Sequence, residues 1–223
     1  MLFRSLGLAR WTLAVVICCG GAAALHAQPT PPIPTPTVAD KPVRLRGTLV
    51  AIDATTITVK ERGGETVALA RPAGMPISEV YPIRLTDIRP GSYIGTAAMP
   101  QADGTQRALE VVVFPEAARG AAESHFPWDL LPESTMTNAT VAGLTAAPTS
   151  VPGGQQLVLQ YPGGEKTIIV PADVPVVSFR PGNNDERALL VPGARVLVNA
   201  QMKDGRPTAL RVNVGRNGFA PPM

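Results

Sequence analysis

Two pairs of turn signals, each repeated about 100 residues further along, constrain the fold of this chain most strongly. The Gly-Gly pair at Gly63-Gly64 recurs at Gly163-Gly164, and the Asp-Gly pair at Asp103-Gly104 recurs at Asp204-Gly205. Each pair separates two runs in which apolar and polar residues alternate. This is the pattern of a β-hairpin, because glycine readily adopts the positive φ that the turn needs. The constant spacing predicts an internal duplication.

The two predicted repeats, residues 43–115 and 138–215, each contain about five strands. This size, with the order hairpin, loop and hairpin, is typical of a small barrel of the OB type. Closing a barrel also removes exposed strand edges, which are prone to aggregate. The 24 Pro residues argue against a helical bundle, because an interior Pro costs about 3 kcal/mol in a helix. We therefore expect an all-β protein of two tandem OB-like barrels, with a pair of β-sandwiches as the alternative.

The first 27 residues read as a secretory signal peptide. Arg4 and Arg10 precede an apolar run that begins at Trp11, and Ala27 ends a stretch that fits a cleavage site. The apolar stretch 11–25 is shorter than the roughly 20 residues that span a membrane. The sequence predicts cleavage and a periplasmic or secreted protein, with an uncleaved membrane anchor as the alternative.

Removal of residues 1–27 changes the composition of the chain. The formal charge falls from +3 to +1, both Cys residues leave, and His125 becomes the single His. No thiolate then remains as a nucleophile or metal ligand. No later stretch is long enough to span a membrane, so we expect a soluble mature protein. The scattered basic residues and few aromatic residues argue against nucleic acid as a partner and leave a protein or a small molecule.

Three further segments complete the predicted organisation. Residues 28–42 are rich in Pro and Thr and should form an extended tether. Residues 116–137 form a linker between the repeats, and residues 216–223 form a tail. The linker is the least repetitive segment between and within the repeats, so we look for a functional site there first.

The linker contains the single His and the single Trp of the predicted mature chain. One interpretation is a ligand site, with Glu123, His125, Trp128 and Asp129 lining a cleft between the barrels. The alternative is structural: Phe126 and Trp128 would pack between the barrels, since each aromatic ring can bury roughly 150–250 Å². His125 would then form a hydrogen bond at the rim.

Metal binding by the predicted mature chain would have to use few ligands. A zinc site usually needs three or four His, Cys, Asp or Glu ligands. A copper-type site can combine His with Met sulfur, and His125 and Met136 are the close pair in the sequence. We therefore expect no cofactor, with copper bound by His125 and Met136 as the alternative.

The sequence lacks several common catalytic motifs. The chain lacks a Gly-rich phosphate-binding loop, a dinucleotide-binding fingerprint and a complete nucleophile elbow. The expected function is that of an exported, non-enzymatic binding or envelope-associated module. The alternatives are a periplasmic metal-handling accessory protein and a small periplasmic hydrolase with His125 as its base.

A resemblance to known proteins is carried by segments 95–104, 108–110 with 114–116, 125–130, 134–140 and 211–223. Together these segments resemble an uncharacterised family of exported proteobacterial proteins with small OB-like domains of unknown function. The resemblance covers the predicted mature chain, and its most specific part is the His-x-Pro-Trp-Asp segment. Some relatives have been labelled metal ABC transporter permeases, but a permease needs several membrane-spanning helices and this chain contains none after the signal peptide. The resemblance implies the fold and the export, and no activity.

Overall fold

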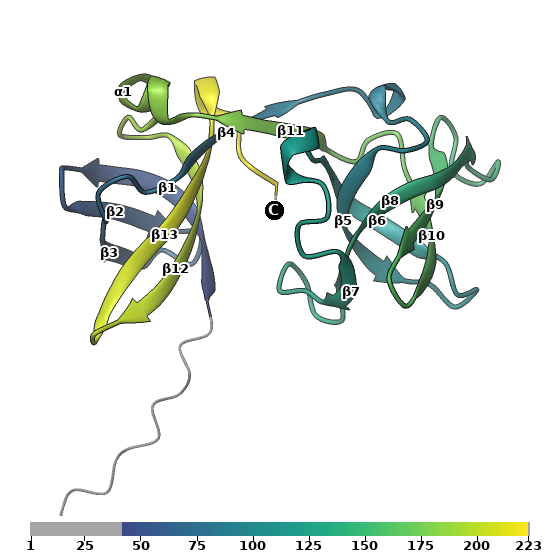
Figure 1. Cartoon of the computed structure of the whole chain (residues 1–223), viewed down its shortest axis with the longest axis horizontal. Coiled ribbons are helices and arrows are strands. Elements are labelled where there is room, and N and C mark those ends of the chain that lie inside the picture. Colours follow the sequence, from purple (N-terminus) through teal and green to yellow (C-terminus); the bar gives the residue numbers. More distant parts are fainter. Residues whose placement is uncertain (1–41, 223) are drawn as a thin grey trace, which may run out of the picture. The chain divides into compact units, whose positions relative to one another are not determined.

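The computed structural model of the chain describes residues 42–222 (Figure 1). The chain divides into two units, Met1–Thr37 and Val38–Met223, and the described residues belong to the second. The predicted signal peptide, residues 1–27, lies outside the described residues, as does the predicted tether except for Pro42. The description below concerns residues 42–222 alone.

Residues 42–222 form thirteen strands and five short helical elements. The strands pair into one continuous sheet that curls into two rings. The strands are β1 Val43–Ile52, β2 Thr56–Glu61, β3 Thr66–Ala70, β4 Ile77–Pro82, β5 Tyr93–Pro100, β6 Gln106–Val113, β7 Ser124–Pro127, β8 Thr135–Ala146, β9 Gln155–Tyr161, β10 Gly164–Val170, β11 Val176–Pro181, β12 Arg195–Lys203 and β13 Arg206–Gly215. The helical elements are η1 Leu85–Asp87, η2 Glu116–Ala118, η3 Asn183–Asp185, α1 Glu186–Leu189 and η4 Arg216–Gly218.

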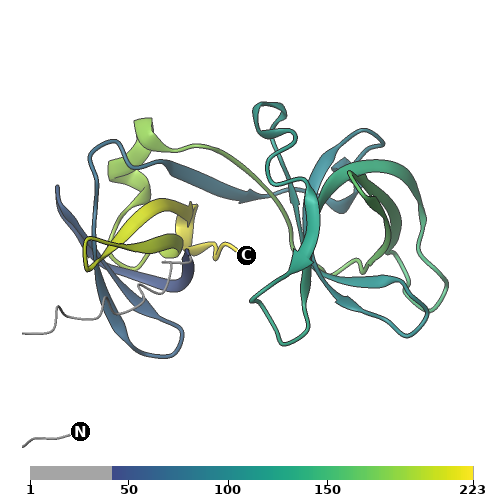
Figure 2. The same ribbon diagram turned by 60° about the horizontal axis from the view of Figure 1, so that its bottom comes forward.

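The first barrel is a closed ring of five strands taken from both ends of the described chain. Strand β2 pairs with β1 and β3, β12 pairs with β1 and β13, and the parallel pairing of β13 with β3 closes the ring. Figure 2 shows the yellow C-terminal hairpin completing the ring of blue N-terminal strands. A parallel closing pair in a five-stranded, otherwise antiparallel ring is the OB arrangement.

The second barrel has the same ring of pairings, made from the middle of the chain. Strand β9 pairs with β8 and β10, β5 pairs with β8 and β6, and the parallel pairing of β10 with β6 closes the ring. The predicted all-β fold with two small OB-like barrels is confirmed. The alternative of paired β-sandwiches is wrong, because each set of five strands closes into a ring.

The composition of each barrel differs from the sequence-based prediction of one barrel per repeat. Strands β1–β3 of segment 43–115 close with β12 and β13, whereas β5 and β6 of the same segment close with β8–β10. The reason lies in β4 and β11, which pair with each other and carry the chain from one barrel to the other (Figure 1). Neither 43–115 nor 138–215 therefore closes a barrel by itself, while residues 83–175 contain every strand of the second.

The two rings correspond in detail around the crossing of β4 and β11. Val80 pairs with Phe179 at the centre of that crossing. Register shifts occur at matching places, between Asn199 and Ala200 of β12 and between Ala97 and Ala98 of β5. The predicted Asp-Gly hairpin of β12 and β13 is present, with Asp204 and Gly205 at φ 51° and 73°, the conformation that a two-residue hairpin loop with this right-handed twist requires.

Each barrel has its own core, and each core combines residues from both predicted repeats. The first core contains Leu49, Ile57 and Val59 together with Val196, Val198 and Val212. The second contains Ile94 and Val111 together with Val141, Leu157 and Ile168. A third, smaller cluster of Val80, Val112 and Val177 lies at the crossing, with Phe179 and Phe219 packed against it. Burial of these side chains stabilises the exchanged arrangement, since apolar burial contributes about 25 cal/mol per Å².

Candidate functional site

Strand β7 carries His125 of the predicted site, with Glu123 just before the strand and Trp128 and Asp129 just after it. His125 pairs with Thr137 of β8, and Phe126 pairs with Met136. Paired residues of an antiparallel ladder share a face, and neighbours along a strand point to opposite faces. His125 and Thr137 therefore lie on one face of the sheet, and Phe126 and Met136 on the other.

His125 lies in a polar setting beside the second barrel. Its Nδ1 is 2.8 Å from the Oγ1 of Thr137, and its ring stacks on Tyr161 with the ring centroids 6.2 Å apart. Partial burial and the positive charge of Lys166 lower the pKa of His125, so the imidazole is neutral at pH 7. The Thr137 side chain is fully buried, so its hydroxyl is not accessible as a nucleophile.

Glu123 immediately precedes β7 and lines a shallow hollow of about 570 Å³. Thr140, Gln160, Tyr161 and Glu165 also line this hollow. Glu123 thus shares the surroundings of His125 and its partner Tyr161, and it is separated from Trp128 and Asp129 by the length of β7.

The predicted copper pair is not brought together. Met136 is 4% exposed and faces away from His125 across β8. Within residues 42–222, no cluster of three or more His, Cys, Asp or Glu side chains is arranged to hold a metal ion. The arrangement of β7 and β8 therefore offers His125 no sulfur ligand from Met136.

Trp128 and Asp129 fasten the loop after β7 to strand β1 of the first barrel. The Arg44 guanidinium carbon lies 3.7 Å from the centroid of the Trp128 ring, and Phe126 meets Trp128 edge-on at 5.8 Å. Asp129 accepts hydrogen bonds from Arg46 at 2.9 Å and Arg44 at 3.4 Å. This contact matches the structural alternative for Phe126 and Trp128, with His125 hydrogen-bonded elsewhere.

The electrostatics of Asp129 favour this anchoring. Partial burial opposes ionisation of Asp129, but the hydrogen bonds and charges of Arg46 and Arg44 outweigh it and lower the pKa of the carboxyl. Asp129 is therefore a carboxylate at neutral pH. The outward side of β1 thus holds a carboxylate of the chain itself through Arg44 and Arg46.

Glu110 of β6 is an unexpected member of the same region. Its side chain is 1% exposed, and neither carboxyl oxygen has a hydrogen-bond partner within the described chain. Burial raises the pKa of Glu110 to about 8, while Arg46 and Arg62 act to lower it and Asp129 acts to raise it. The Nε1 of Trp128 is also buried without a partner among the described residues. Glu110 is therefore largely protonated at pH 7, at a point where charges of both barrels meet.

Sequence reasoning missed Glu110, although a signal was present. The residue interrupts the apolar run Ala108–Val113, and an acidic residue there reads as the solvent-facing side of a strand. Its partner on β5 is Ala97 and the next residue across is Met136 of β8. Both are buried, so this outer face of the second barrel is covered.

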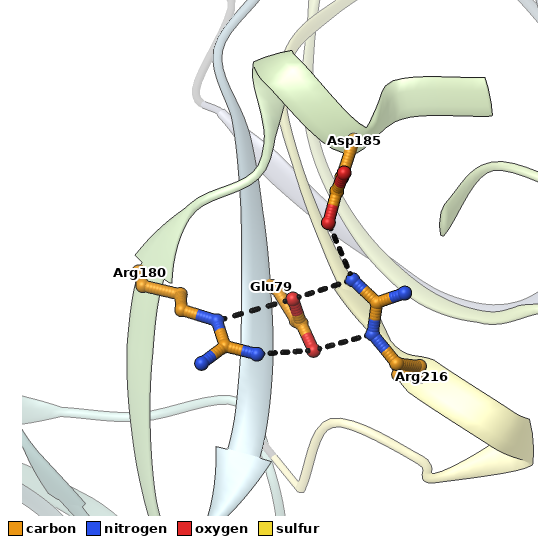
Figure 3. A network of polar contacts seen from close by, with 4 residues as sticks. All are labelled: Glu79, Arg180, Asp185 and Arg216. Atoms are coloured by element: carbon orange, nitrogen blue, oxygen red, sulfur yellow. Dashed lines mark hydrogen bonds and ion pairs between the residues drawn. The ribbon is translucent and has the colours of Figure 1, made fainter. Parts of the chain in front are cut away.

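A second buried carboxylate, Glu79 of β4, fastens the crossing strands (Figure 3). Arg216 binds it through two hydrogen bonds of 2.9 and 3.0 Å, and Arg180 through two of 3.2 and 3.1 Å. Arg216 also contacts Asp185 at 2.8 Å. The hydrogen bonds from Arg216 outweigh burial, and with Arg180 they lower the pKa of Glu79 to about 2. This network ties β4, β11 and η4 together.

The charges are unequally divided between the barrels. Residues 43–82 with 176–222, which form the first barrel and its crossing strands, contain 12 Lys and Arg against 7 Asp and Glu, a formal charge of +5. Residues 83–175 contain 5 against 9, a formal charge of −4. The small net charge of the chain thus conceals a basic barrel joined to an acidic one.

The fold and these contacts define a class: an all-β protein of two OB-like barrels with exchanged strands and a charged contact between them. No protein-family model matches the chain, and neither a curated protein nor a solved structure matches it. Within residues 42–222, none of the helices has the length and apolar character needed to cross a membrane.

Proposed function

We propose that the protein is an exported, non-enzymatic binding module. The observation that carries this proposal is the division of charge, +5 on the first barrel and −4 on the second. Clusters of one sign attract oppositely charged partners and speed their association. A protein with one strongly basic barrel suits the capture of an anionic partner.

Export is part of the proposal and rests on the sequence of residues 1–27. The basic start, the apolar run and the small residues before Ala27 have the order of a secretory signal peptide. We place the mature protein in the periplasm or outside the cell.

Internal duplication is likewise proposed from the sequence and supported by the matching strand registers. The turn signals recur after about 100 residues, and both rings have a register shift at the corresponding strand. Duplication would explain why strands of one segment can close a barrel with strands of the other.

The test is export with the natural leader, followed by a ligand screen. The chain is expressed with residues 1–27 intact, the exported protein is purified, and its thermal unfolding is measured with acidic and neutral polysaccharides, acidic peptides and metal ions. We expect recovery from the exported fraction and stabilisation by at least one anionic ligand. Retention in the cytoplasm, or no stabilisation by any ligand class, would overturn the proposal.

A further inference from the structure

The outward face of the sheet β1–β12–β13 carries basic side chains in register. Arg44 of β1 pairs with Asn199 of β12, and Asn199 pairs with Arg211 of β13. Val198 and Val212, the neighbours of Asn199 and Arg211, lie in the core of the first barrel. Because side chains alternate along a strand, Arg44, Asn199 and Arg211 must point outward.

Two adjacent rows extend this basic face. Arg46 pairs with Leu197, which pairs with Asn213, and Thr48 pairs with Arg195. Lys60 of β2 pairs with Thr48 and lies on the same side. The outward positions of these rows hold five basic residues and no acidic residue. The basic residues are Arg44, Arg46, Lys60, Arg195 and Arg211.

Some basic side chains of this face are accessible and form no ion pair with an acidic residue of the described chain. Arg211 and Lys60 are exposed, and Arg195 is half-buried. None of these three side chains forms an ion pair with another residue in the described range 42–222. The acidic group that reaches the face is Asp129, which Arg44 and Arg46 hold. The Arg211 end of its row is therefore open, while Arg44 at the other end of the same row already binds a carboxylate.

The matching row of the second barrel has different chemistry. Met136, Ala97 and Glu110 occupy the positions of Arg44, Asn199 and Arg211, next to the corresponding register shift. These three residues are buried. One barrel thus covers this face with apolar contacts, and the other leaves arginine and asparagine on it.

We infer that the outward face of β1, β12 and β13 binds a linear acidic polysaccharide. This inference rests on the proposed function and names its ligand class. Arginine suits carboxylate and sulfate groups, while Asn199, Asn213 and Thr48 can hydrogen-bond to sugar hydroxyls.

Other anionic partners fit this face less well. The strand positions of these rows hold no aromatic residue, and the ring that reaches the face, that of Trp128, already stacks on Arg44 and is not free for nucleic-acid bases. The apolar residue of the rows, Leu197, is buried, so the rows offer no exposed apolar side chain to a lipid surface. The strands β1 and β12 are paired on both sides, which leaves no strand edge there for a peptide.

The experiment uses alginate, a carboxylated linear polysaccharide, as the probe and dextran as its neutral control. Binding of the exported protein is measured by biolayer interferometry between 50 and 300 mM NaCl. The test variant is Arg211→Glu, Arg211→Lys keeps the charge, and Arg107→Glu makes the same charge change at an exposed position of β6. Thermal unfolding of each variant confirms folding, and Arg211→Gln replaces Arg211→Glu if the latter fails to fold.

We expect salt-sensitive binding of alginate and none of dextran. Arg211→Glu should weaken the affinity for alginate by at least tenfold, about the effect of losing one charge-assisted contact. The affinities of Arg107→Glu and Arg211→Lys should stay within about threefold of that of the natural protein. Equal losses in Arg211→Glu and Arg107→Glu would overturn the inference. So would tighter binding of polyglutamate, single-stranded DNA or anionic vesicles, and in that case the proposed binding function would stand. Failure of the proposed function itself would show as no ligand in the preceding screen.

Discussion

Replacing Glu110 by Gln should stabilise the protein at neutral pH. The Glu110 carboxyl is buried and its oxygens lack hydrogen-bond partners among the described residues, and burial raises its pKa from 4.5 to about 8. Between these values the folded state holds a proton that the unfolded chain has released. The free energy of unfolding therefore falls as the pH rises from 4.5 to 8.

The magnitude follows from the pKa values. Each tenfold change in proton affinity corresponds to about 1.4 kcal/mol, so the carboxyl destabilises the fold by about 3 kcal/mol at pH 7 relative to pH 4. A Gln side chain has nearly the same shape and cannot ionise. The free energy of unfolding of Glu110→Gln should thus be about 3 kcal/mol higher than that of the natural protein at pH 7. At pH 4 the two free energies of unfolding should be equal.

The assay is urea unfolding at pH 4, 5, 6, 7 and 8, followed by the fluorescence of Trp128, the single Trp outside the predicted signal peptide. Glu65→Gln is the matched control, because Glu65 is exposed and its replacement should change the stability little at any pH. A Glu110→Gln protein that is no more stable than the natural one at pH 7 would refute the reasoning. A gain of the same size at pH 4 would refute the electrostatic cause.

Three other outcomes test the architecture. The fragment 83–175 should unfold cooperatively on heating, as followed by circular dichroism, because it holds all strands of the second barrel. The fragment 43–115 should show no cooperative transition, and finding one would contradict the exchange of strands. Glu79→Gln should lower the free energy of unfolding by about 3 kcal/mol at pH 7, since it removes the buried carboxylate whose pKa Arg216 and Arg180 lower from 4.5 to about 2. The stability that this carboxylate adds should persist above pH 4.5 and decline as the pH falls towards 2. Equal urea midpoints at pH 7 would count against the network. Asp129→Asn should increase the protease sensitivity of the loop after β7. The free energy of unfolding should change by about 1 kcal/mol or less, because Asp129 is partly exposed. Unchanged cleavage of the loop would argue against the anchoring role of Asp129.

Local patterns in the sequence predicted the strands, the hairpins and the barrel type. The hairpin at Asp204-Gly205 and the alternation around it depend on a few neighbouring residues. The partner of each strand could not be read in the same way. Strand β1 presents the same inward apolar residues whether it closes with β5 or with β12, so alternation does not distinguish them. The choice is made by β4 and β11, which continue straight and pair with each other.

The candidate site was predicted in part. Position in the sequence grouped His125 with Trp128 and Asp129. In the structure His125 bonds to Thr137 of β8, whereas Trp128 and Asp129 lie in the loop after β7 and contact Arg44 and Arg46 of β1. Glu110 was not predicted, because its burial arises from the outer face of a strand being covered by distant segments. The contacts of Arg44 and Arg46 with Asp129 join residues more than 80 positions apart, beyond the range of any local pattern.

The exchange of strands also sets the order in which the protein can assemble. The second barrel is encoded by one continuous stretch and can close as soon as β10 has been synthesised. The first barrel has β1–β3 at the start and must wait for β12 and β13, about 125 residues after β3. Contacts so distant in sequence slow folding, because the chain must first close a long loop. Half of a barrel, with the free edges of β1 and β3, therefore persists through most of synthesis, and this intermediate is where a chaperone would be most effective.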